Sequence, residues 1–436
     1  MNDMERDLRD MMHRKVDAAE YTPRATAPLV RRARVRRART TLVGAMAIVA
    51  LMVGGFAAAR SMSRNDALPP ADEQPKPTLR PGTNGWVAVD GYQDGGSIYL
   101  VRPGEDARRL KIAGPGATSD ACPTWSPDGT RLMFGRLTDS SGTASNNAEL
   151  VILPVGSDGA SGAPTRIGLD GFEVLEGFDP HPCAIWAPDS RWVALAGSGE
   201  VWVVDTQTGD IRRLPDLRPS DLEWRPGTDE LTIAGDMGSN RDAPTLSTPV
   251  TVYSVSTGEL RQLGSIEAAH ITWSPDGTSL AYTVAESDSQ QLWLVDGDGT
   301  NERLLADIGP AIHGIGPVWS PTGDRIAYQR RLGSDGAEAH EVVLVNVADG
   351  TQTAIEPPEA DGHEWYPFTV SWSPDGTTLL YAGWNYDDET LPEGVIAVPA
   401  DKPSDATALI TGINPVPNYY SHRWGPIQMW GRQPGS

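Results

Sequence analysis

The sequence is poor in the residues and motifs that mark most enzymes and nucleic-acid-binding proteins. It has only two cysteines and five phenylalanines among 436 residues, and it contains no Gly-x-Ser-x-Gly segment. The missing segment removes the usual signature of a serine hydrolase, and two cysteines allow one disulfide at most. The net charge is −22, and an acidic protein of this kind does not bind nucleic acid by neutralising its phosphates. Hydrophobic residues nevertheless make up 39% of the chain, which indicates a folded protein and not a disordered one.

Charged residues are also missing from residues 40–59, a run of twenty uncharged residues. As a helix rising about 1.5 Å per residue, this run would span about 30 Å, the thickness of a bilayer's hydrocarbon core. Six arginines lie just before it, between residues 31 and 39, whereas only Arg60 and Arg64 follow closely. The positive-inside rule therefore predicts a transmembrane helix over residues 40–59, with residues 1–39 in the cytoplasm. A cleavable signal peptide is the alternative, because the run ends in Ala57-Ala58-Ala59, which resembles a cleavage site.

The segments on either side of this run differ in character. Residues 2–20 of the basic tail place apolar side chains at helical spacing, which predicts an amphipathic helix. That helix would dock a cytoplasmic regulator such as a transcription factor; the alternative is that it frays in water because it is short. Residues 60–83 contain five prolines and no apolar periodicity, which predicts an extended linker.

A tryptophan followed by a proline turn recurs along the rest of the chain. Its fullest form is Trp-Ser-Pro-Asp-Gly, and its last copy is a degenerate Trp-Gly-Pro. The copies begin at Trp125, Trp186, Trp224, Trp273, Trp319, Trp372 and Trp424. The spacings lie between 38 and 61 residues, which is typical of propeller blades with loop insertions.

Each repeat reads as four short strands. In residues 269–305, a strand ends at Trp273, and Pro275-Asp276-Gly277 makes a tight turn. Proline presets φ in such a turn, and glycine takes the residue with positive φ. The segments SLAYTVA, QLWLVDG and RLL then follow as three further strands. Four antiparallel strands make one blade.

The two ends of the domain complete each other. Residues 85–112 supply a second, third and fourth strand without a first, and residues 420–426 supply a first strand with nothing after it. Joined, they make a seventh blade that closes the ring without an exposed sheet edge. The sequence therefore predicts an all-β, seven-bladed propeller over residues 84–427, followed by a C-terminal tail over residues 428–436.

These repeats resemble those of the TolB-like, WD40-like β-propeller family, whose repeat is also called PD40. The resemblance rests on the Trp-Ser-Pro-Asp-Gly turns and on strands such as LAY and LWLVD, and it extends from Gly85 to Pro426. It implies the propeller fold. A membrane segment stands where TolB has an N-terminal α/β domain, so we expect a role other than that of TolB in the Tol–Pal system.

Loop lengths predict which face of the propeller binds a partner. The long loops join second to third strands or one blade to the next, which places them on one face, and elaborated loops on a rigid scaffold commonly bind ligands. Histidines, acids and aromatic residues gather in these loops. The predicted binding residues are His181, His270, His313, His363, Trp365, Tyr366, Trp384, Tyr386, Glu176 and Asp179.

Three functions are compatible with these features. The first is a membrane-tethered, extracytoplasmic propeller that binds or senses a protein or a cell-envelope glycan, without a catalytic residue, metal or cofactor. The second is a lyase-like enzyme acting on polysaccharide, which requires three or more histidine and acid side chains to converge. The third is a transmembrane regulator whose cytoplasmic helix binds a transcription factor. Asp296-Gly-Asp298 resembles half of a calcium loop but lacks the later ligands, so a simple turn is expected there.

The two cysteines occupy equivalent positions in consecutive repeats. Cys122 and Cys183 each stand three residues before a repeat tryptophan. The same height on neighbouring inner strands brings Cα atoms near the limit of about 7 Å for bridging. We expect a disulfide, which the oxidising environment outside the cytoplasm permits. The alternative is two small buried thiols.

Overall fold

The computed structural model describes the propeller and leaves residues 1–83 outside the described part. The predicted cytoplasmic helix, transmembrane helix and linker therefore lie outside the described residues. Within the described part, no helix is long and apolar enough to span a membrane. The described ranges are 84–91, 97–110, 119–138, 148–156, 159–160, 162–173, 181–197, 199–217, 219, 221–234, 248–286, 289–309, 316–331, 340–355, 359–360, 363–364, 366–384, 394–411 and 430–432.

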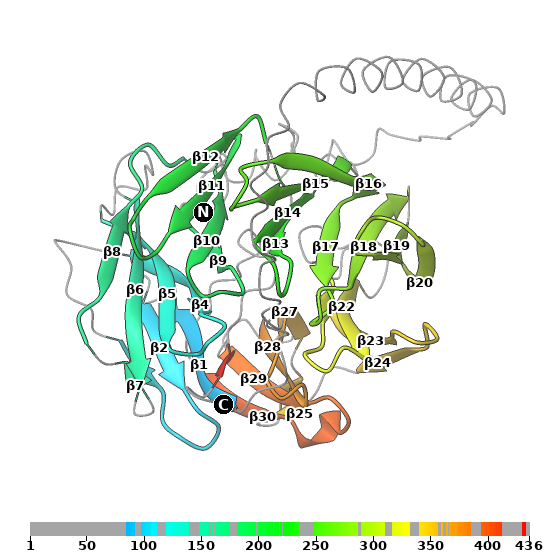
Figure 1. Cartoon of the computed structure of the whole chain (residues 1–436). Helices are drawn as coiled ribbons and strands as arrows, with labels where there is room; N and C mark the ends of the chain where they lie inside the picture. Colours follow the sequence, from blue (N-terminus) through cyan, green and yellow to red (C-terminus); the bar gives the residue numbers. More distant parts are fainter. Residues whose placement is uncertain are drawn as a thin grey trace, which may run out of the picture. The chain divides into compact units, whose positions relative to one another are not determined.

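Seven antiparallel sheets are arranged as the blades of a propeller (Figure 1). The first three blades in chain order are blade 1, with β4 (Ser119–Trp125), β5 (Arg131–Leu137), β6 (Ala148–Gly156), β7 (Gly159–Ala160) and β8 (Thr165–Gly168); blade 2, with β9 (Ala184–Trp186), β10 (Trp192–Ala196), β11 (Glu200–Asp205) and β12 (Ile211–Pro215); and blade 3, with β13 (Asp221–Trp224), β14 (Glu230–Ala234), β15 (Thr248–Ser254) and β16 (Leu260–Ala268).

The next three blades follow the same plan. They are blade 4, with β17 (His270–Trp273), β18 (Ser279–Glu286), β19 (Ser289–Asp296) and β20 (Arg303–Gly309); blade 5, with β21 (Val318–Trp319), β22 (Arg325–Arg331), β23 (His340–Asn346) and β24 (Gln352–Ile355); and blade 6, with β27 (Tyr366–Trp372), β28 (Thr378–Trp384), β29 (Gly394–Pro399) and β30 (Thr407–Thr411). A small hairpin of β25 (Glu359–Ala360) and β26 (His363–Glu364) lies between blades 5 and 6 in the sequence, and the 3-10 helix η2 (Pro403–Asp405) precedes β30.

Blade 7 is shared between the two ends of the domain, as the sequence predicts. Its strands are β1 (Asn84–Gly91), β2 (Ser97–Val101) and β3 (Arg108–Arg109), together with β31 (Trp430–Arg432), which pairs with β1. In the structure, residues 430–432 pair with β1 as the first strand of this blade, whereas the sequence predicts residues 420–426, which lie outside the described residues. The propeller therefore extends into the predicted tail over residues 428–436.

The pairing register shows why Trp430, and not Trp424, is the seventh repeat tryptophan. In each of the six continuous blades, the tryptophan pairs with an apolar residue seven positions later, as Trp273 does with Leu280. In blade 7, Trp430 pairs with Val87. Trp424 was favoured because Gly-Pro follows it, but no turn joins the first and second strands of this blade, so the proline signal is not needed there.

The Ser-Pro-Asp-Gly turns are held by their own side chains. In blade 4, the Ser274 hydroxyl donates to Asp276 Oδ1 at 2.6 Å, and the Thr278 amide donates to the same oxygen at 3.0 Å. Burial raises the pKa of Asp276, but these hydrogen bonds outweigh it and lower the pKa overall. Gly277 takes φ +68°, the left-handed conformation that the turn requires. The serine hydroxyl is thus engaged in the turn, in agreement with a structural role for the motif.

Three of the repeat tryptophans join their blade to the one before it through the indole nitrogen. The indole nitrogens of Trp186, Trp224 and Trp372 donate to the carbonyls of Thr124, Ile185 and Val318, at 3.2–3.3 Å. Each accepting carbonyl belongs to the residue just before the preceding repeat tryptophan. Apolar clusters fill the space between sheets in the same way: one contains Val252 of blade 3 together with Leu280 of blade 4. The core is therefore a series of inter-blade layers.

A disulfide joins Cys122 of β4 to Cys183, which immediately precedes β9, with the two Cα atoms 5.3 Å apart. This is the pairing that the sequence predicts. Cys122 lies in an irregularity of the β4–β5 pairing and has φ +58°. Its amide donates to Asp90 Oδ2 of blade 7 at 2.8 Å. Blades 7, 1 and 2 are thus connected at one point by a hydrogen bond and a covalent bond.

Candidate functional site

The ring has two unlike faces, which we call the turn face and the loop face. The turn face carries the turns between first and second strands, and the loop face carries the connections between second and third strands. The described chain begins on the turn face, because the amide of Asn84 donates to Asp375 Oδ2 at 2.9 Å in the turn of blade 6. In return, the Asp375 backbone N–H donates to Asn84 Oδ1 at 3.2 Å.

Two of the predicted histidines have described side chains, and they lie in separate contacts. His181 Nε2 lies 3.0 Å from Ser119 Oγ, which links blade 2 to blade 1. His270 is 1% exposed, and its Nδ1 lies 3.6 Å from Asp221 Oδ2 in blade 3. The structure therefore places these histidines at different blade junctions.

The other predicted binding residues are described only in part. The backbone of Tyr366 pairs directly with that of Trp384, although the sequence assigns the two to different loops. His363 pairs with Ala360 in the β25–β26 hairpin. The remaining predicted residues lie outside the described part of the chain: His313, Trp365, Tyr386, Glu176 and Asp179.

The structure draws attention to two acids that the sequence analysis did not select, Asp221 and Glu223 on β13. Both are buried, and both reach the inner edge of β17 in the next blade. Asp221 Oδ2 accepts from the Ile271 backbone N–H at 2.9 Å, and Glu223 Oε2 accepts from the Trp273 backbone N–H at 3.0 Å. β17 pairs on one side only, so these carboxyl groups satisfy N–H groups that its sheet leaves open.

His270 completes this cluster at the junction of blades 3 and 4. It stands at the same register as Cys122 and Cys183, three residues before its tryptophan. In blade 5 that register holds Gly316, where an added Cβ would lie 3.1 Å from His270 Cβ. His270 therefore lies between Asp221 and Gly316, and a side chain at residue 316 would crowd it.

The pKa of Glu223 is strongly perturbed. Burial raises it well above its usual value, and the nearby Asp221 carboxyl group raises it further. The hydrogen bonds from Trp273 and Thr272 oppose this rise but do not offset it. The protonated form of Glu223 is therefore favoured at this buried site.

Glu223 also lines a cavity of about 200 Å³ at the ring centre, on the turn face. The walls combine the repeat tryptophans with the prolines that follow them, in six consecutive blades. Ser126 and the residues just before the tryptophans complete the lining: Thr124, Ile185, Glu223, Thr272, Val318 and Ser371. Glu223 is the one ionisable side chain among the residues that line it.

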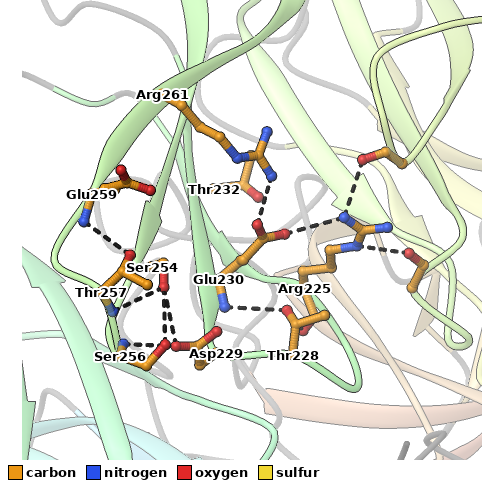
Figure 2. Close-up of polar contacts among 12 residues, drawn as sticks. Arg225, Thr228, Asp229, Glu230, Thr232, Ser254, Ser256, Thr257, Glu259 and Arg261 are labelled. Carbon is orange, nitrogen blue, oxygen red and sulfur yellow. Dashed lines mark hydrogen bonds and ion pairs between the residues drawn. The ribbon is translucent and has the colours of Figure 1, made fainter. Parts of the chain in front are cut away.

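Arg225 makes polar contacts across this junction, as Figure 2 shows. Its guanidinium carbon lies 4.6 Å from the ring centre of Trp273. Its Nε donates to the Gly277 carbonyl at 2.9 Å, and its Nη1 donates to the Gly297 carbonyl at 3.1 Å. Glu230 accepts from both Arg225 and Arg261, at 3.1 and 2.6 Å. Glu230 thus balances the charge of Arg225 within blade 3, while Nε and Nη1 of Arg225 also bind carbonyl groups of blade 4.

Among the described residues, no group of three or more His, Cys, Asp or Glu side chains is arranged to hold a metal ion. Asp221 lies 3.6 Å from His270, and one oxygen each of Asp221 and Glu223 accepts from a backbone N–H group of β17. These side chains form a buried polar contact between blades 3 and 4.

The closed ring of Trp-Ser-Pro-Asp-Gly repeats gives this chain the fold of a TolB-like, WD40-like β-propeller. No family model and no curated protein sequence matches it. Solved structures similar to it include TolB from Acinetobacter baumannii, with 15% identity, a TM-score of 0.40 and coverage of 62% of each chain. The alignment thus spans less than two thirds of that TolB.

Two further similar structures are a lyase and a second TolB. An oligogalacturonate lyase in complex with manganese shares 13% identity at a TM-score of 0.44, over 74% of this chain and 84% of the lyase. A putative TolB from Agrobacterium tumefaciens shares 17% identity at a TM-score of 0.35, over 53% and 80% of the two chains. At these identities the likeness concerns the fold alone.

Proposed function

We propose that the chain is a membrane-tethered, extracytoplasmic propeller whose loop face binds a protein or a glycan of the cell envelope. The observation that carries this proposal is the disulfide between the only two cysteines, Cys122 and Cys183. Disulfides of this structural kind persist outside the reducing cytoplasm. The apolar run over residues 40–59, preceded by six arginines, supports the tether and its orientation.

The geometry of the ring supports binding at the loop face. The described chain enters the propeller at Asn84 on the turn face, so the linker does not have to cross the loop face. The backbones of Tyr366 and Trp384 pair across the strands where β27 begins and β28 ends, so two of the predicted binding residues occupy paired positions of blade 6. Aromatic residues on a rigid scaffold commonly dominate an interface.

Protease accessibility tests the topology. Full-length protein carrying an N-terminal epitope is produced in cells, and protease is added to intact protoplasts. We expect the propeller to be digested while the N-terminal epitope is spared, and permeabilised cells should lose both. A propeller that is protected in intact protoplasts contradicts the proposed location.

Binding is tested with full-length protein purified from envelope extracts. Trp365→Ala, Tyr366→Ala and Trp384→Ala should each weaken capture of the same partner, by about 2 kcal/mol for a true anchor. Leu260→Ala is the matched control, because Leu260 is an exposed hydrophobic residue at the start of the outer strand β16. Equal losses with Leu260→Ala, or no loss with the aromatic variants, would contradict a loop-face interface.

A further inference from the structure

We propose that the central cavity on the turn face is a binding site for a small organic amine, with the Glu223 carboxylate as the counter-ion of its ammonium group. This site lies on the opposite face from the proposed partner interface. It goes beyond the proposed function and does not depend on it.

The cavity has a suitable size for such a ligand. Its volume is about 200 Å³, whereas an apolar protein cavity of about 150 Å³ is enough to bind benzene. Tryptophan and proline residues make up most of its lining, which suits an apolar body. Two threonines and a serine at its inner end, Thr124, Thr272 and Ser371, add hydroxyl groups.

The charges around the cavity favour a cation. Glu223 is the one ionisable group in the lining, and Asp221 lies behind it on the same strand. The guanidinium groups of Arg131, Arg225 and Arg325 lie over the indole rings of repeat tryptophans, at 4.6–5.7 Å from the ring centres. None of these three arginines lines the cavity. Each is already engaged: Arg225 with Glu230, Arg325 with Asp401 at 2.7 Å, and Arg131 with the Ser190 carbonyl.

The propeller repeat does not require an acid at this position. The residue before the tryptophan is Thr124, Ile185, Thr272, Val318 or Ser371 in the other continuous blades. Glutamine at residue 223 would accept the Trp273 N–H bond equally well and would avoid burying an ionisable group. A buried acid with a perturbed pKa in a cavity is a typical feature of a functional site.

Binding should be coupled to proton release. Burial and the nearby Asp221 carboxyl group hold Glu223 in its protonated form, and an ammonium group can pair with it only once the proton has left. The titratable group that acts on Glu223 is Asp221 on the same strand, and His270 of β17 lies 3.6 Å from Asp221. Affinity should therefore rise with pH through the pKa of Glu223, while the amine itself stays protonated.

Calorimetry on the full chain in detergent tests the site, with benzylamine as the probe and benzyl alcohol as its neutral match. Titrations in two buffers of different ionisation enthalpy report the protons released. We expect saturable benzylamine binding with release of about one proton, and binding of benzyl alcohol at least tenfold weaker. Equal affinity for the two probes, binding without proton release, or no benzylamine binding overturns the proposal.

Two variants separate the cavity from the acidic surface. Glu223→Gln should weaken benzylamine binding at least tenfold and abolish proton release, because glutamine keeps the shape but not the charge. Glu259→Gln removes an acid on the surface of blade 3 (Figure 2) and should leave both unchanged. If Glu259→Gln weakens binding as much as Glu223→Gln, the amine is held by surface charge and the cavity is not its site. Trp384→Ala, which tests the loop face, should not change benzylamine affinity.

Discussion

Neighbouring inner strands are joined by different side-chain pairs at two junctions, between blades 1 and 2 and between blades 3 and 4. At the register three residues before the tryptophan, the first junction has Cys122 and Cys183, and the second has Asp221 and His270. One pair is covalently bonded, and the other is held at 3.6 Å in a buried polar contact. The repeat thus fixes which positions face each other across a junction, and it leaves the chemistry of those positions free.

The junction of blades 7 and 1, where Cys122 also lies, shares a feature with the junction of blades 3 and 4. In each, a carboxyl group of the preceding blade accepts from an open backbone N–H group of an inner strand: Asp90 from Cys122, and Asp221 from Ile271. The junction of blades 3 and 4 adds a second such acid, Glu223. We therefore expect the junction of blades 1 and 2 to govern stability and the junction of blades 3 and 4 to respond to pH.

The largest effect should come from breaking the covalent junction. Replacing both Cys122 and Cys183 by alanine removes a cross-link over 61 residues, which in the chain-entropy model is worth about 4 kcal/mol of unfolding free energy. Urea unfolding of the propeller measures this loss. Reductant should destabilise the wild type by a similar amount and leave the variant unchanged; a wild type indifferent to reductant would show that the bridge contributes little.

The next effect should come from Asp221→Ala at the polar junction. The variant leaves the Ile271 N–H group and His270 without their acid, and one unsatisfied buried polar group costs roughly 2 kcal/mol. Asp221→Asn keeps an acceptor and should lose less stability in the same urea experiment. Equal losses for the two variants would mean that charge, and not hydrogen bonding, holds this junction.

A smaller effect, with a defined pH dependence, is expected for Glu223→Gln. The pKa of Glu223 is raised in the folded state, so its contribution to stability is complete below the unfolded pKa and is lost as pH rises through the folded pKa. The variant should match the wild type near pH 4 and become relatively more stable as pH rises toward 8. Urea unfolding at a series of pH values measures the difference, and a constant difference would refute the proposed protonated state.

The smallest effect should come from replacing Arg225 at the same junction. Arg225→Met removes the contact with Trp273 and the bonds to the Gly277 and Gly297 carbonyls, a loss of about 1 kcal/mol for a partly exposed cation–π group. Arg225→Lys keeps the charge but not the two-pronged geometry and should recover only part of the loss. Thermal unfolding detects both changes. If Arg225→Lys recovers the full stability, the positive charge alone accounts for the contribution of Arg225.

Most of the fold could be predicted from the sequence because the turn motif makes strict local demands. Trp273, Pro275, Asp276 and Gly277 each serve a separate requirement of one turn, so their joint recurrence marks a blade without reference to the rest of the chain. The motif does not mark Trp430, because no turn joins its strand to the second strand of blade 7. Its partner, Val87, lies more than three hundred residues away, and only the paired register reveals it.

The candidate sites were less predictable for a related reason. Asp221 and Glu223 are two acids in a short strand, a pattern that in isolation indicates a solvated face. Their burial follows from the open N–H groups of β17, which belong to the next blade. In the same way, the backbone pairing of Tyr366 with Trp384 depends on where β27 begins, and loop boundaries are poorly fixed by local sequence.

The closing blade also has a consequence for how the protein is made. β31 is the last strand of the propeller to be synthesised, and it pairs with β1, which is the first. Until residues 430–432 have emerged from the ribosome, the first strand of blade 7 is missing and one edge of β1 is unpaired. The ring therefore cannot close until β31 has been synthesised, even when the other six blades are complete. During that interval β1 can pair with the wrong partner. Translation that stops shortly before residue 430 should therefore yield an open ring, because β1 then lacks its partner strand.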